Sequence, residues 1–207
     1  MVARGTVNIA PNTYAGGTYG TVSVPATGMP LVFLRSAGFA AVADARPGSF
    51  TYFMATGVTT LDYWAFAPPQ DVGARFGMQV YTDRGSLAFD AAQRYLRIAG
   101  VVQTGKALNF NDTGGVGEIA SFGLPGNLPA VCFVDAGFQF QALTGNGVSG
   151  GLTFRTVARC AMRIAGNALQ LAHVQSIGSM TLPSDVHVNT RTASTPTAVI
   201  VADVANM

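Results

Sequence analysis

The two histidines, His173 and His187, are the residues of this sequence best suited to acid–base or metal chemistry. The nearest catalytic or metal-binding group would combine them with Asp185 and Asp203. Alternate residues of a strand point to the same side, so Asp185 and His187 would present a carboxylate and an imidazole together. Zinc takes both ligand types but needs at least one more. We therefore favour a structural role for the histidines.

Carboxylates are the second group to consider, because glycan-cleaving enzymes use a pair of them. The ten acidic residues are scattered along the chain, and Glu118 is the one glutamate among them. This leaves little choice of general acid. We expect that the protein is not an enzyme and has no catalytic residues.

The two cysteines, Cys132 and Cys160, each lie within an apolar, strand-like run. They are too few for a disulfide framework and lack the spacing of a metal site. We expect two buried free thiols, with a bridge between neighbouring strands as the alternative.

Residues 109–118 form the one loop where a metal or phosphate site could be suspected, because Asn109, Asn111 and Asp112 lie close together there. A calcium loop of the hand type also needs carboxylates at its odd positions and a closing bidentate glutamate, which this loop lacks. No Gly-Lys-Ser/Thr ending for phosphate follows. An ordinary turn or bulge is expected, with no metal and no cofactor.

Charge is scarce in this chain of 207 residues, since only 11% are charged while 49% are apolar. A typical soluble domain has about 25% charged residues. This composition favours a protein that hides much of its surface in an assembly. No uninterrupted apolar run is long enough for a membrane helix, although alternating strands are also typical of proteins that cross a membrane with strands. The net charge of +2 is spread out, so nucleic-acid binding is not expected.

Short apolar runs with turn residues between them predict β-strands throughout. The residues 152–164 are ambiguous because arginines recur every four positions, but their β-branched content and flanking glycines favour a strand. Gly166 and Asn167 form the next predicted turn. Runs that read as strands occupy residues 31–34, 39–42, 49–55, 60–66, 128–141, 152–164, 168–177, 180–182, 186–190 and 197–204.

The clearest structural signal is a predicted β-hairpin at residues 76–90. Apolar residues alternate on either side of Thr82-Asp83-Arg84-Gly85, and Gly85 occupies the position that needs a positive φ. One face would be apolar and the other polar. Residues 95–102 would then form the third strand of a meander.

The expected fold class is all-β, either an antiparallel β-sandwich or two small β subdomains, with an extended N-terminal arm. Residues 1–28 would be this arm, or edge strands that become ordered against a neighbouring subunit, since they hold few large side chains. Residues 29–104 would form one β subdomain around the hairpin. Residues 118–207 would form a second subdomain or a second sheet.

The hairpin region resembles a segment of small tail proteins of double-stranded DNA phages. The matching residues are Gly77, Gln79, Val80, Tyr81, Gly85, Leu87, Phe89 and Asp90, followed by a basic–apolar strand at 93–98. Residues 30–33 and 63–66 are similar to what precedes that hairpin. The resemblance covers about a third of the chain. It implies a structural virion protein of the tail tip, baseplate or fibre-attachment region, and it carries over no catalytic residue.

The function predicted from these observations is oligomeric assembly within a phage tail, after synthesis in the host cytoplasm. The expected partners are further copies of the chain, with a trimer favoured, and other tail proteins. The alternative is a receptor-binding tail module that contacts a host-surface glycan or a pilus. Aromatic side chains that would suit sugar binding in that alternative are Tyr14, Tyr19, Tyr52 and Trp64.

Overall fold

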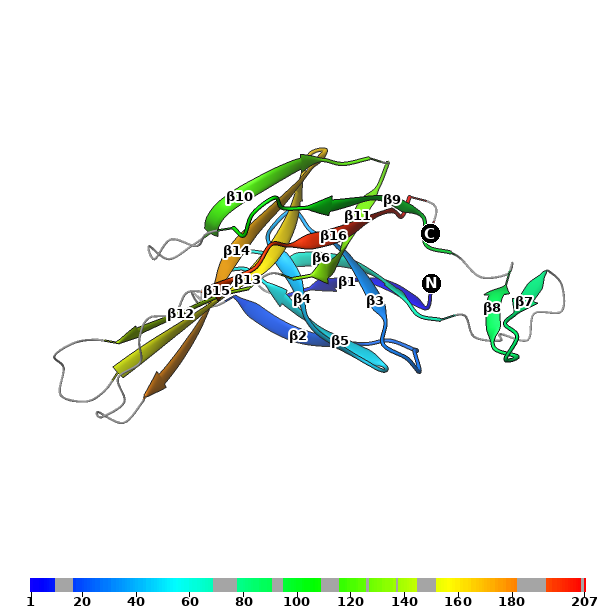
Figure 1. The fold of residues 1–207 in the computed structure, drawn as a ribbon, viewed down its shortest axis with the longest axis horizontal. Helices are drawn as coiled ribbons and strands as arrows, with labels where there is room; N and C mark the ends of the chain where they lie inside the picture. The colour runs from blue at the N-terminus through cyan, green and yellow to red at the C-terminus, as the bar shows by residue number, and fades with distance from the viewer. Residues whose placement is uncertain are drawn as a thin grey trace.

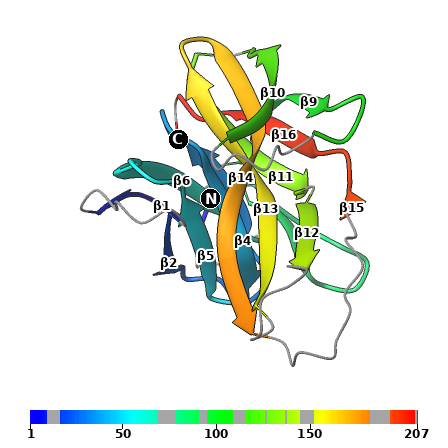
Figure 2. The same ribbon diagram turned by 90° about the vertical axis from the view of Figure 1, so that its left-hand side faces the viewer.

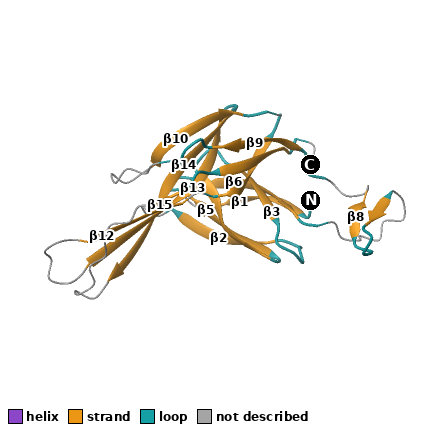
Figure 3. Ribbon diagram, viewed as in Figure 1, coloured by secondary structure: helices purple, strands orange, loops and turns teal. Residues whose placement is uncertain are grey.

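The computed structural model describes residues 1–9, 17–68, 78–90, 95–108, 116–125, 127–136, 138–144, 152–181, 193–205 and 207. Within these residues the regular secondary structure consists of β-strands, and no helix is present (Figure 3). The strands form two large antiparallel sheets and one separate hairpin. The prediction of an all-β fold is confirmed.

The first large sheet has six strands, and its central strands come from distant parts of the sequence. In spatial order it contains β1 (Ala3–Asn8), β6 (Thr60–Phe66), β3 (Leu31–Arg35), β11 (Pro129–Asp135), β16 (Ala198–Asp203) and β9 (Ile98–Gln103). β1 and β9 are its edges.

The second large sheet has eight strands. Its main path is β10 (Val116–Gly123), β14 (Ala168–Thr181), β13 (Leu152–Ala165), β4 (Ala40–Arg46), β5 (Ser49–Met54) and β2 (Thr18–Ser23). β12 (Phe138–Thr144) joins beside β13, and β15 (Ala193–Ser194) pairs with β12. Figure 2 shows β5, β4, β13 and β14 side by side.

The two sheets pack face to face as a sandwich, because alternate residues of both supply one apolar interior. The six-stranded sheet contributes Leu34 and Val131, and the eight-stranded sheet contributes Phe50, Met162 and Leu171. Each of these side chains is almost fully buried. Truncating a large side chain in such an interior typically costs about 2–5 kcal/mol.

The outer faces of both sheets also carry buried apolar side chains. On the six-stranded sheet, Phe33, Trp64 and Cys132 pack with residues near the chain ends such as Val204 and Met207. A smaller cluster on the eight-stranded sheet contains Phe39, Ala41, Phe53, Ala161, Ala172 and Val174. The guanidinium of Arg163 lies over the ring of Phe39 at 4.7 Å from its centroid, a favourable cation–π geometry.

The predicted division into subdomains at 29–104 and 118–207 does not coincide with the boundary between the sheets. β3 pairs with β11 inside one sheet, and β4 pairs with β13 inside the other. Each sheet therefore combines strands from both parts of the chain. The two sheets form one interior between them.

The N-terminal segment forms edge strands. β1 pairs with β6 at an edge of the first sheet, and β2 pairs with β5 at an edge of the second. Both strands find their partners within the same chain. Of the two alternatives considered for this segment, β1 and β2 correspond to edge strands.

The ambiguous segment 152–164 is a strand, as predicted. β13 and β14 pair along their whole length through a two-residue turn at Gly166 and Asn167. Gly166 has a φ of 61°, which glycine adopts without a steric penalty. The part of this ribbon beside β12 extends from one end of the sandwich (Figure 1).

The predicted hairpin is present as β7 (Gln79–Tyr81) and β8 (Leu87–Asp90). Gly85 has a φ of 76°, and its N–H donates to the carbonyl of Thr82 at 2.9 Å. The turn chemistry is therefore as predicted. Residues 76 and 77 lie outside the described part of the chain.

The surroundings of the hairpin differ from the prediction. β9 pairs with β16 and not with β8, so the described strands of this region do not form a meander. Among the described strands, β7 and β8 pair only with each other, and they lie beyond the opposite end of the sandwich from the β12–β13–β14 ribbon (Figure 1). Val80 and Tyr81, on opposite faces of β7, are about half exposed.

Substituting Gly85 tests whether the hairpin is an independent unit. A Cβ added at Gly85 would meet no atom within 4 Å, so Gly85→Val should be unfavourable through its positive φ alone, by about 1–2 kcal/mol. Amide exchange in β7 and β8 should accelerate by about 5- to 30-fold. The thermal midpoint of the sandwich should not change, because neither large sheet includes the hairpin.

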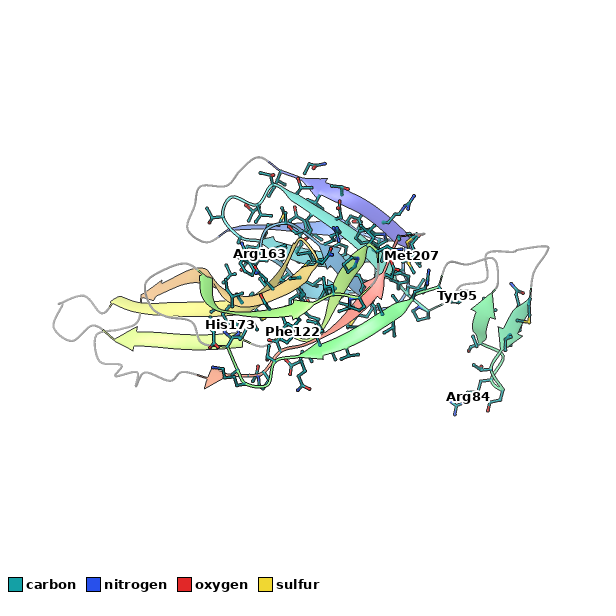
Figure 4. The ribbon with its side chains drawn as sticks, turned by 90° about the horizontal axis from the view of Figure 1, so that it is seen from above. Arg84, Tyr95, Phe122, Arg163, His173 and Met207 are labelled. Carbon is teal, nitrogen blue, oxygen red and sulfur yellow. The ribbon has the colours of Figure 1, made fainter. Side chains whose placement is uncertain are left out.

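Arg84→Ala is the matched control, since Arg84 lies at the exposed tip of the same turn (Figure 4). It should change stability by no more than about 0.5 kcal/mol. Faster exchange in Arg84→Ala than in Gly85→Val would show that the turn assignment is incorrect.

Candidate functional site

The candidate histidine and aspartate residues do not form a site within the described structure. His173 is fully buried on β14 (Figure 4). The carboxylate of Asp203 accepts hydrogen bonds from the N–H groups of Ala205 and Leu128 at 3.2 and 3.3 Å. These backbone donors lower the pKa of Asp203, and the hydrogen bond from Ala205 has the largest effect. Asp203 therefore holds a turn, while Asp185 and His187 lie outside the described residues.

The sheet register creates one pairing that the sequence did not reveal. Cys160 lies directly opposite His173 in the ladder between β13 and β14, and directly opposite residues share a face. The sequence separation hides this proximity. The turn at Gly166 and Asn167 could have indicated it, because a two-residue turn fixes which residues pair.

A cysteine beside a histidine can act as a nucleophile when the histidine activates the thiol. Here both side chains are fully buried, and burial raises the pKa of the Cys160 thiol to about 11. The thiol therefore stays protonated near neutral pH and is closed to a substrate. The pair is part of the apolar interior.

Cys132 lies in the outer cluster of the six-stranded sheet, where burial raises the pKa of its thiol to about 11 as well. Both cysteines are buried and neither is bridged. The prediction of two buried free thiols is confirmed. No group of three or more His, Cys, Asp or Glu side chains that could hold a metal occurs among the described residues.

Thiol labelling provides a test of this burial. Both cysteines should react slowly in native buffer and rapidly in denaturant, because the reactive thiolate is scarce and closed to solvent. The thiol pKa is about 11 in the folded chain and 9.0 by ordinary values, so ionisation at high pH favours the unfolded chain. The free energy of unfolding should therefore fall as pH rises from about 9 to 11.

Replacing both cysteines with alanine is the control for the pH effect. The fall in stability between about pH 9 and 11 should be smaller in this double variant than in the parent. Immediate labelling of either thiol in native buffer would contradict its burial.

Two surface pockets adjoin Asp62 on β6. The larger, about 540 Å³, is lined by residues that include Arg35, Ser36, Gly38, Val58, Thr60 and Asp62. The Ser36 hydroxyl donates to the carbonyl of Thr60 at 3.1 Å. A Cβ on Gly38 would lie 2.3 Å from a methyl carbon of Val58. A hydrogen bond and a close approach therefore join the residues 36–38 to the residues 58–60 along this wall.

The second pocket, about 320 Å³, lies on the β1 side of Asp62 and is lined by residues that include Arg4, Thr6, Trp64 and Met207. Thr6 donates its hydroxyl to the Asp62 carboxylate at 2.7 Å. Arg4 donates to the carbonyl of Met207. The pockets thus present one carboxylate between arginines, a polar lining that suits a hydroxyl-rich ligand.

The aromatic residues considered for sugar binding are spread over different surroundings. Tyr52 is buried, and Trp64 is only 8% exposed although it lines the smaller pocket. Tyr19 is exposed and its ring lies 5.0 Å from the ring of Phe53. Tyr14 lies outside the described residues. Of the three that lie within the described residues, Trp64 alone lines either of the two pockets beside Asp62.

The Asn/Asp-rich loop lies mostly outside the described residues, which resume at Val116. Glu118, on β10, forms an ion pair with Lys106 at 3.0 Å. The sequence also contains a Gly-x-Ser-x-Gly pattern at 147–151, outside the described residues. As a nucleophile elbow this pattern connects a strand to a helix, and the described residues include no helix.

Large apolar side chains are exposed on the separate hairpin and on β9. Met78, Val80 and Tyr81 are exposed at the hairpin, and Ile98 and Val101 are exposed on β9. Other exposed apolar residues are Met29, Leu31, Tyr95, Ile119 and Val134. Surfaces of this kind are typical of protein contacts.

Comparisons of the chain with family models, curated proteins and solved structures yield no match. The likeness to phage tail proteins consequently depends on the sequence segments described above. In the described residues there is also no helix that could span a membrane.

Proposed function

We propose that this chain is a structural protein of a phage tail, located at the tail tip, baseplate or fibre-attachment region, and that it acts by assembly. The observation that carries the proposal is the separate β7–β8 hairpin with its exposed Val80 and Tyr81. The same hairpin holds the residues that resemble tail proteins. The β7–β8 hairpin therefore combines the sequence resemblance to tail proteins with an exposed apolar surface that could contact another subunit.

The physical support is that a two-stranded hairpin is at best marginally stable by itself in water. The described hairpin adds to neither large sheet, and side chains on both of its faces are exposed. Contact with a neighbouring subunit would remove this apolar surface from water, at about 25 cal/mol for each Å² buried. Assembly would therefore stabilise the hairpin and use its exposed surface.

The surroundings of the reactive groups also favour assembly over catalysis. The Cys160 thiol is buried with a raised pKa, and Asp203 is engaged with backbone donors. The thiol is closed to a substrate, and the carboxylate is already occupied by two backbone N–H groups. We propose that the protein is not an enzyme, that it forms a homo-oligomer and binds other tail proteins, and that it resides in the virion.

Electron microscopy of particles from the strain that encodes this chain tests the tail assignment. An antibody against the chain should label the tail end of intact particles, while an antibody against an unrelated host protein should not. Purified particles that lack the chain would overturn the assignment, as would labelling confined to the head.

The second candidate function is binding of a host-surface glycan, favoured by the two pockets that share Asp62. Their arginines and carboxylate could bind sugar hydroxyl groups through charge-assisted hydrogen bonds. The small exposed area of Trp64 leaves little surface for stacking against a sugar. Structural assembly therefore remains our first proposal.

Substituting Asp62 tests the glycan proposal. If the pockets bind host polysaccharide, Asp62→Ala should weaken binding by about 10- to 100-fold, the loss expected for a hydrogen bond to a charged group. Asp44→Ala is the control, because Asp44 pairs with Arg46 on the exposed surface of β4. Equal binding by the parent and Asp62→Ala would exclude these pockets.

A further inference from the structure

The two edges of the six-stranded sheet present different side chains to solvent. β1 exposes Arg4, Thr6 and Asn8, and polar and charged residues discourage further strand pairing. β9 exposes Ile98 and Val101, at 61% and 67% of their surface. Within the described structure β9 pairs with β16 alone. The β9 edge is therefore apolar, and no described strand pairs with the side of β9 that faces away from β16.

Val101 ends an apolar row that crosses the outer face of the sheet. The ladders pair Val101 with Ile200, and Ile200 with Cys132. The row continues on β3 and β6 with Phe33 and its partner Trp64. Cys132, Phe33 and Trp64 are buried in the outer cluster, and Ile200 is partly buried against it. The row becomes open to solvent at β9.

We propose that β9 pairs antiparallel with β9 of a second copy of the chain, about a two-fold axis at Val101. An axis perpendicular to the sheet keeps the outer faces of both copies on the same side. Val101 then lies opposite the partner's Val101, and the apolar rows join. The two six-stranded sheets become one continuous sheet. This inference deepens the proposed assembly function and rests on it, with a two-fold pair in place of the trimer expected from the sequence.

The charge pattern supports a second copy as the occupant. Residues 98–105 contain no charged side chain and no proline, so neither repulsion nor a missing N–H opposes the ladder. The register places Arg97 opposite the partner's Gly105. Like charges therefore do not lie opposite one another. Each copy supplies the same uncharged strand to the contact.

Light scattering of the purified chain tests the pairing. The parent should have twice the 21.4 kDa mass of one chain at micromolar concentration. Val101→Lys should be a monomer with an unchanged circular dichroism spectrum, because it puts two lysines opposite each other at an exposed position. Asn8→Lys, on the other edge of the same sheet, should remain a dimer.

A parent that is monomeric, or that has the mass of a trimer, would overturn this pairing, as would a dimer that persists in Val101→Lys. None of these outcomes decides the tail assignment, which depends on labelling of particles. Failure of the β9 contact and failure of the proposed function are thus distinguishable.

Cross-linking tests the register directly. Directly opposite residues have Cβ atoms about 4.5–5.5 Å apart, so Val101→Cys should form an intermolecular disulfide under mild oxidation. Cys132 and Cys160 are buried and should not interfere. Asn8→Cys should give no cross-linked dimer. Equal cross-linking of the two variants, or none in Val101→Cys, would overturn the proposed axis.

Discussion

The apolar interior between the two sheets holds the molecule together, and neither half of the chain can form it alone. Leu34 and Val131 lie in neighbouring strands of one sheet, while Ala40 and Met162 lie in neighbouring strands of the other. Each pair joins residues far apart in the sequence. Loop-closure entropy must therefore be overcome before these contacts add stability, which predicts slow and cooperative folding.

Burial on both faces of the sheets accounts for part of the low charge content. Phe33 and Leu34 are adjacent, yet one is buried in the outer cluster and the other in the interior. Strands covered on both sides leave few positions for charged side chains. The composition therefore need not mean that the whole surface is hidden by assembly. The exposed apolar residues of the hairpin and β9 are a more specific indication of partners.

The Cys160–His173 pair shows why proximity alone does not make a site. The register places the two residues directly opposite each other, but burial disfavours the Cys160 thiolate. Asp62 has the opposite setting, since it lines two open pockets and accepts a hydrogen bond from Thr6. Access and hydration decide which polar group can meet a ligand.

The sequence by itself determined the strand type of most segments, the turns at Gly85 and Gly166, and the burial of both cysteines. These features are local, because side chains alternate along a strand and glycine tolerates positive φ. Only the tertiary structure decided that β9 pairs with β16, that the hairpin belongs to neither large sheet, and that Cys160 lies opposite His173. Strand partners depend on how all apolar faces are buried together, and alternation within one segment does not specify its neighbour.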